Sequence, residues 1–128
     1  MLLSGTHNLG DIALLSQDPE LAARHYRVAM EMCRRLGNER VEIYCVAGLA
    51  CVSALQRDTY SAGRLWAMAE GLETRLGTPM VGAERAQYER IMIPLQDDQA
   101  FRSGEESGRE VDLGDALREL LTASPAPS

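Results

Sequence analysis

Apolar residues recur along most of this chain at intervals of three and four positions, the spacing that places them on one face of an α-helix. The pattern is clearest in residues 19–36 and returns in residues 59–76. Each stretch is followed by a glycine, Gly37 or Gly77. Glycine just past the last turn is a common helix C-cap. We therefore predict two helices of similar length that end at these glycines.

The residues ahead of both stretches are suited to starting a helix. Asp18 can act as N-cap, and Pro19 then occupies the first helical position, where its missing N–H removes no hydrogen bond. Asp58 or Thr59 can cap the second stretch. These signals fix where we expect each helix to begin.

Two further helices are predicted beside these. Residues 39–56 are apolar on almost every side, which is typical of a helix packed between neighbours. Residues 3–17 can form a partner helix for residues 19–36. The organisation is helix–turn–helix, twice, so the expected fold class is all-α, with antiparallel helix pairs at about 3–37 and 39–77.

The last third of the chain, 79–121, is also predicted to be helical. Thr78 can cap a new helix with Pro79 behind it, and Pro94 should kink or end that helix. Residues 97–110 contain two Ser-Gly pairs, which weaken any helix there. Asp112 can cap a final helix that runs to residue 121.

A pattern of small and aromatic residues repeats after 40 positions. The small–aromatic–small sets are Ala22, Tyr26 and Ala29, then Ala62, Trp66 and Ala69. Leu9-Gly10 precedes the first set and Leu49-Ala50 the second. These spacings resemble the tetratricopeptide repeat, although its period is about 34 residues. The resemblance implies a short α-solenoid of stacked helix pairs over residues 1–121, followed by a disordered tail at 122–128.

Three segments in the last third of the chain indicate a narrower group of tetratricopeptide proteins. The segments are "ERAQYERIMIPL" at 84–95, "AF" at 100–101 and "GREVDLGDAL" at 108–117. Residues 8–121 are similar to the C-terminal tetratricopeptide region of bacterial MalT-like and AfsR-like ATP-dependent transcriptional regulators, STAND proteins that often carry a LuxR-type DNA-binding domain. The family's ATP-binding P-loop requires a lysine, which this sequence lacks, and no basic helix-turn-helix follows. The resemblance therefore implies the non-catalytic repeat module alone.

Composition is that of an ordinary globular protein, and the charge argues against direct binding of nucleic acid. The 128 residues carry a net charge of −6, and 45% are hydrophobic. Residues 97–119 alone contribute −5. Because phosphate backbones demand clustered positive charge, direct nucleic-acid binding is not expected. The longest weakly charged stretch, 41–55, is too short to span a bilayer. Three cysteines at irregular spacing fit a reducing cytoplasm, so we expect a cytoplasmic protein.

The sequence offers no evident catalytic or metal site. His25 and Cys33 would lie about 12 Å apart along one helix, too far for a nucleophile and its base. Cys45 and Cys51 fall on different helix faces and are expected to be core residues. We identify neither a Cys-x-x-Cys motif nor a cluster of His, Asp and Glu. We therefore expect no catalytic residue, no metal and no cofactor.

The one surface that the resemblance nominates is the concave face of the repeat array. There the first helix of each pair would present Ser4, Ala47 and Gly48 together with the residues expected to bind a protein partner: His7, Asn8, Asp11, Tyr44 and Cys51. The alternative is that these positions form an ordinary solvated helix face.

The chain starts as if inside a longer array, with no polar capping helix ahead of its first pair. We expect this end to leave apolar surface for a protein partner or a second copy of the chain. The predicted function is a non-catalytic protein–protein interaction module. The alternative is a ligand-sensing module that binds a small molecule or peptide.

Overall fold

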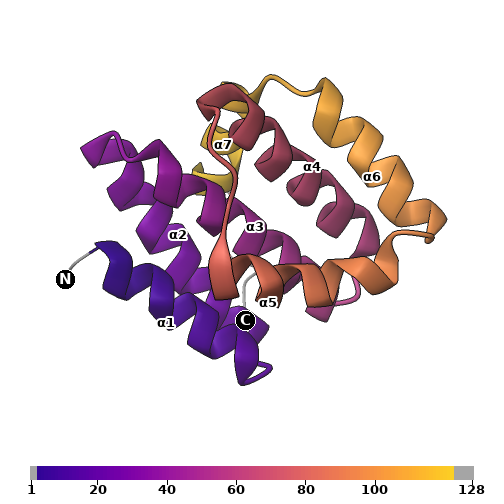
Figure 1. The fold of residues 1–128 in the computed structure, drawn as a ribbon, viewed down its shortest axis with the longest axis horizontal. Coiled ribbons are helices and arrows are strands. Elements are labelled where there is room, and N and C mark those ends of the chain that lie inside the picture. Colours follow the sequence, from indigo (N-terminus) through magenta and orange to yellow (C-terminus); the bar gives the residue numbers. More distant parts are fainter. Residues whose placement is uncertain (1–2, 123–128) are drawn as a thin grey trace.

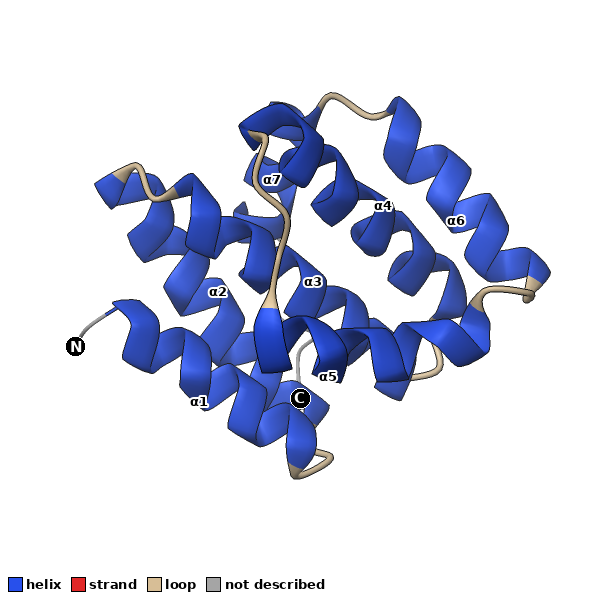
Figure 2. Ribbon diagram, in the orientation of Figure 1, coloured by secondary structure: helices blue, strands red, loops and turns tan. Residues whose placement is uncertain are grey.

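The structure, a computed structural model, describes residues 3–122, so the predicted tail lies outside the described residues except for Thr122. This range is helical, without strands (Figures 1 and 2). The elements are α1 (Leu3–Leu15), α2 (Pro19–Leu36), α3 (Glu39–Leu55), α4 (Thr59–Leu76), α5 (Gly82–Met92), the 3-10 turn η1 (Ile93–Leu95), α6 (Gln99–Glu110) and α7 (Leu113–Thr122). The all-α prediction is confirmed. In residues 3–122 no helix is long and apolar enough to cross a membrane.

The helix ends follow the capping signals. The side chains of Asp18, Asp58 and Asp112 each accept a hydrogen bond from the backbone N–H three residues further on. Gly37 and Gly77 adopt the left-handed conformation, with φ of 69° and 75°. The choice between Asp58 and Thr59 as cap therefore falls on Asp58. Local sequence alone places these boundaries.

The first four helices pack in the order in which they occur along the chain. α1 lies against α2, α2 against α3 and α3 against α4, while α1 also touches α3 (Figure 1). Every residue of α3 from 42 to 52 is buried, as expected for a helix enclosed by neighbours. This arrangement makes α3 the centre of the hydrophobic core.

Tyr26 joins α2 to both α1 and α3 through two glycines. A methyl group placed on Gly10 would lie 2.7 Å from Cε1 of the Tyr26 ring, and one on Gly48 would lie 2.3 Å from Cζ. Both distances are far inside van der Waals contact, so the ring occupies the space that side chains at these positions would need. The fully buried ring thus sets the separation of three helices.

The expectation that Ser-Gly pairs would weaken a helix over 97–110 is wrong, because their glycines pack directly against another backbone. Added Cβ atoms would lie 2.0 Å from the Tyr60 carbonyl oxygen at Gly104, and 2.3 Å from the Arg64 carbonyl oxygen at Gly108. These contacts place α6 closely alongside α4 (Figure 1). The close packing of α6 against α4 offsets the low helix propensity of these glycines.

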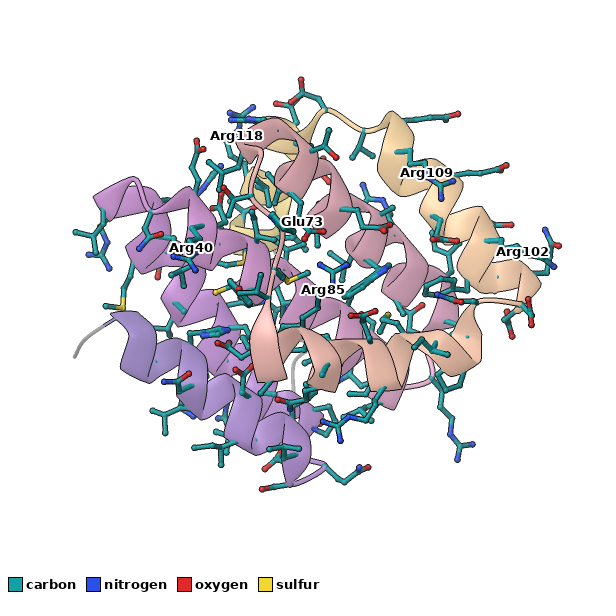
Figure 3. All side chains as sticks on the ribbon, viewed as in Figure 1. Arg40, Glu73, Arg85, Arg102, Arg109 and Arg118 are labelled. Atoms are coloured by element: carbon teal, nitrogen blue, oxygen red, sulfur yellow. The ribbon has the colours of Figure 1, made fainter. Side chains whose placement is uncertain are left out.

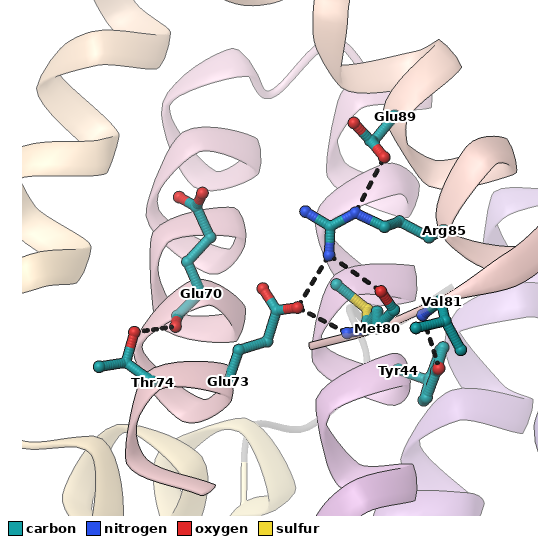
Figure 4. A network of polar contacts seen from close by, with 8 residues as sticks. All are labelled: Tyr44, Glu70, Glu73, Thr74, Met80, Val81, Arg85 and Glu89. Carbon is teal, nitrogen blue, oxygen red and sulfur yellow. Dashed lines mark hydrogen bonds and ion pairs between the residues drawn. The ribbon is translucent and has the colours of Figure 1, made fainter. Parts of the chain in front are cut away.

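The predicted start of the next helix at Thr78 is also wrong. Residues 78–81 have no regular structure, and α5 begins at Gly82, where φ is +74°. The Met80 N–H donates to Glu73 Oε2 at 2.6 Å, and the Val81 N–H donates to the Tyr44 hydroxyl at 3.0 Å (Figure 4). Side chains therefore satisfy these donors outside a helix, which lets the chain turn before α5.

Pro94 acts as predicted, since α5 ends at Met92 and the proline lies within η1. The turn at residues 78–81 carries α5 across α3, with which it packs, rather than parallel to α4 (Figure 1). The third pair, α5 and α6, is consequently splayed: α6 covers α4, and α5 covers α3.

The close approach of α4 and α6 can be tested at Gly63, whose added Cβ would lie 2.1 Å from the Phe101 carbonyl oxygen. We expect Gly63→Ala to destabilise the fold by about 1–3 kcal/mol, because backbone atoms must move apart. Gly71→Ala in the same helix is the matched control. Its Cβ would make only ordinary contact, 3.5 Å from Leu113, so a gain of up to about 1 kcal/mol is expected from helix propensity. Urea unfolding of both variants provides the measurement, and equal effects would contradict the packing.

Candidate functional site

The residues predicted to line an open concave face are mostly covered. His7, Asp11, Tyr44 and Cys51 are buried, and of the five only Asn8 is exposed. The expectation of an open face here is wrong because α5 lies over it. Whether these residues bind a protein partner stays a prediction.

Two tyrosines converge on Asp11 beneath α5. The Tyr26 hydroxyl from α2 and the Tyr88 hydroxyl from α5 each donate to Asp11 Oδ1 at 2.6 Å. Such short O–H···O distances are typical of hydrogen bonds to a charged acceptor. Gln87 of α5 adds a bond to the Asp11 backbone carbonyl at 3.2 Å. Asp11 therefore fastens α1, α2 and α5 together.

His7 lies one helical turn before Asp11 and faces the same space. Its Nε2 is 3.6 Å from Asp11 Oδ2, 3.1 Å from Glu84 Oε2 and 3.1 Å from the Tyr88 hydroxyl. His7 is 5% exposed, whereas the Glu84 side chain is 40% exposed and lies at the edge of the cluster next to solvent. A His–Asp–Glu cluster with two buried members thus forms where α1 meets α5, and we call these three residues the α1–α5 cluster.

This cluster was not predicted from the sequence, and the expectation that His, Asp and Glu would not gather is wrong. The signals were two i,i+4 pairs, His7 with Asp11 and Glu84 with Tyr88, each of which lies on one helix face. Nothing in the sequence showed that α5 would cross α1. That crossing depends on where α5 starts and ends.

Burial governs the protonation of the cluster. Desolvation lowers the pKa of His7, although the charge of Asp11 opposes this effect. Desolvation, together with a hydrogen bond to Asp11 and its charge, raises the pKa of Glu84 to about 7. Desolvation also raises the pKa of both Tyr26 and Tyr88. His7 and the tyrosines are therefore neutral near pH 7, while Glu84 titrates there.

The cluster offers the kinds of atom that bind metal ions. His7, Asp11 and Glu84 each provide one ligand atom, and these atoms lie within 4.8 Å of one another. Cys51 is a poor candidate for a nucleophile, because burial raises the pKa of its thiol and the thiolate is the reactive form. Cys33 and Cys45 are likewise buried and not in a disulfide, as the sequence suggested for Cys45 and Cys51.

A second polar network lies beside the turn into α5. Glu73 Oε2 accepts from Arg85 Nη1 at 2.8 Å, and Arg85 Nε donates to Glu89 at 3.0 Å (Figure 4). Arg85 points inward to Glu73, whereas Arg102 extends outward from α6 (Figure 3). An open groove of about 420 Å³ adjoins this network, lined by Glu70, Glu73, Thr74, Gly77, Thr78, Pro79, Met80 and Arg85. These contacts position α5, and the groove is open to solvent.

Comparisons of the chain with protein-family models, with curated proteins and with solved structures found no match. The resemblance to the repeat region of MalT-like and AfsR-like regulators therefore stays a hypothesis that rests on the motifs in the sequence.

The raised pKa of Glu84 predicts a pH dependence of stability. Between its ordinary pKa of 4.5 and about 7, the folded chain keeps a proton that the unfolded chain has lost. The Glu84 contribution to the free energy of unfolding must then fall as pH rises through this window. The lowered pKa of His7 acts in the opposite sense. Below pH 6.5 the unfolded chain binds a proton on this imidazole more readily than the folded chain does, so the His7 contribution to the free energy of unfolding rises as pH rises toward 6.5.

The Glu84→Gln variant separates these two effects because it retains His7. We expect the difference in unfolding free energy, wild type minus variant, to decrease from pH 4.5 to about 7 and then to level off. Urea unfolding at a series of pH values, with a chelator present, measures this difference. A difference that does not change with pH would contradict the burial of the Glu84 carboxyl beside Asp11.

Proposed function

We propose that this chain is a non-catalytic protein–protein interaction module of the tetratricopeptide type, related to the repeat region of a bacterial transcriptional regulator without its ATPase and DNA-binding parts. The observation that carries the proposal is an uncovered apolar surface on α1. Leu9, Ile12 and Leu15 are 38%, 58% and 67% exposed. They follow one another at intervals of three residues and lie on the side of α1 that faces away from α2 and α3.

This surface, which we call the α1 outer face, consists of uncharged residues. The exposed positions of α1 from residue 5 onward are Gly5, Asn8, Leu9, Ile12 and Leu15. The single carboxylate of α1, Asp11, points inward to the two tyrosines. An apolar face on an otherwise polar protein surface is typical of an interaction site.

The charge of the molecule favours a second copy as the partner on this face. A net charge of −6 makes two copies repel one another over most of their surfaces. A two-fold contact brings the same patch of both copies together, so a charged patch would oppose itself. The α1 outer face avoids this cost because it is uncharged. Burying its three large side chains in a dimer is favourable by about 1.5–3 kcal/mol for each one that becomes fully covered.

The second candidate function is a ligand-sensing module, favoured by the buried polar cluster between α1 and α5. A ligand that altered the cluster would change how α5 lies over α3, because Tyr88 and Gln87 of α5 hydrogen-bond to Asp11. The open groove beside Glu73 offers a small molecule less enclosure than such ligands usually require. We therefore rank this function second.

The proposed dimer can be tested with a pair of matched isoleucines. Ile12 in the α1 outer face is 58% exposed, and Ile93 in η1 is 56% exposed. We expect light scattering across a concentration series to give a dimer mass for the wild type and for Ile93→Asp. Ile12→Asp should be a folded monomer, because each interface would bury two unpaired carboxylates.

A wild type that is monomeric at every concentration would refute self-association through this face. A dimer that persists in Ile12→Asp but dissociates in Ile93→Asp would place the interface elsewhere. Circular dichroism of both variants establishes that they remain helical.

A further inference from the structure

We propose that the α1–α5 cluster is a binding site for one divalent transition-metal ion, held by His7 Nε2, Asp11 Oδ2 and Glu84 Oε2. These atoms come from two helices that are about 70 residues apart in sequence and meet only in the folded chain. An imidazole nitrogen with two carboxylate oxygens is a ligand set that zinc and its neighbours in the first transition row bind. The site is separate from the α1 outer face.

The cluster has more acceptor atoms than protons to fill them. Both tyrosine hydroxyls donate to Asp11 Oδ1, so neither hydrogen reaches Oδ2 or Glu84. Once Glu84 has lost its proton, the remaining donor is the single N–H of the His7 imidazole, which the Tyr88 oxygen can accept at 3.1 Å when it lies on Nε2. Glu84 Oε2 is buried and receives no hydrogen bond, although it lies 3.1 Å from the imidazole nitrogen. A cation would satisfy this orphaned oxygen and its neighbours together.

The spacing of the atoms fits a metal coordination sphere. With metal–ligand bonds of about 2.0–2.1 Å, the ligand atoms of a tetrahedral site lie about 3.3 Å from one another. His7 Nε2 is 3.1 Å from Glu84 Oε2 and 3.6 Å from Asp11 Oδ2. A fourth position is left for water or for the Tyr88 hydroxyl. Small side-chain movements are sufficient to close the site around an ion.

The surroundings of the cluster have the features of a supported metal site. The two tyrosine hydroxyls hold Oδ1 of Asp11 and leave Oδ2 facing His7, which is how outer groups usually orient a metal-binding carboxylate. The His7 imidazole can bind an ion through Nε2 in the tautomer that carries its hydrogen on Nδ1. Glu84, 40% exposed, provides the route from solvent.

A bound ion would connect α1 to α5 directly. It would therefore hold α5 over the face that α1 and α3 would otherwise present, and would stabilise the folded chain in proportion to its affinity. Loss of the ion would loosen this cover without disturbing the packing of α4 on α6.

Isothermal titration of the full chain with zinc chloride, under reducing conditions, tests the proposal. We expect one equivalent to bind and the melting temperature to rise. His7→Gln and Glu84→Gln should each weaken binding by about tenfold or more. Glu84→Gln keeps the size of a half-exposed side chain and so preserves the fold. His25→Gln removes the other histidine of the chain and should bind zinc as the wild type does.

Cobalt(II) distinguishes the cluster from the three cysteines. Coordination by nitrogen and oxygen gives visible d–d bands without the near-ultraviolet charge-transfer absorption of cobalt thiolates. The absence of saturable zinc binding would overturn the proposal. Equal zinc affinity in His7→Gln and His25→Gln, or a cobalt thiolate spectrum, would overturn it as well.

Discussion

Two tyrosine hydroxyls share one carboxylate oxygen of Asp11, and the arrangement of α1, α2 and α5 depends on that shared acceptor. The Tyr26 ring reaches this oxygen by lying between Gly10 and Gly48. Any residue larger than glycine at these two positions would clash with the ring. The ring therefore fixes the separation of α1 and α3, and its hydroxyl fixes the orientation of Asp11. Tyr88 then uses the same oxygen to hold α5 over both. A buried carboxylate oxygen that accepts two hydrogen bonds from different helices makes one packing much more favourable than its alternatives.

The position of α5 changes which surfaces of the molecule are free to bind. The inner face of α1 and α3, which a tetratricopeptide array would leave open, is occupied by the chain's own helix. The apolar positions that remain exposed on α1 point the other way. The proposed partner binding through the α1 outer face and the proposed metal binding in the α1–α5 cluster would therefore use different residues of α1.

The sequence predicted the parts of the fold that depend on local chemistry. Asp18 and Asp58 cap, Gly37 and Gly77 terminate, and Pro94 ends α5, because each acts within one or two helical turns. The errors lie where distant segments meet. Gly104 disfavours a helix in isolation but fits against α4. The helix after Gly77 starts later than predicted because the Glu73 and Tyr44 side chains accept hydrogen bonds from the backbone N–H groups of residues 80 and 81. The α1–α5 cluster could not be predicted for the same reason, since it is created by a helix crossing.

The most direct test of the shared acceptor is hydrogen–deuterium exchange of the Tyr88→Phe variant, with Tyr60→Phe as control. Tyr60 is 45% exposed on α4, so its hydroxyl should contribute little. Removing the Tyr88 hydroxyl takes a donor from a charged buried acceptor, which should speed exchange in α5 by about ten- to a hundredfold. Exchange in α4 and α6 should stay as in the wild type. Unchanged protection of α5 would contradict the account, because it would mean that α5 is held in place by something other than Asp11.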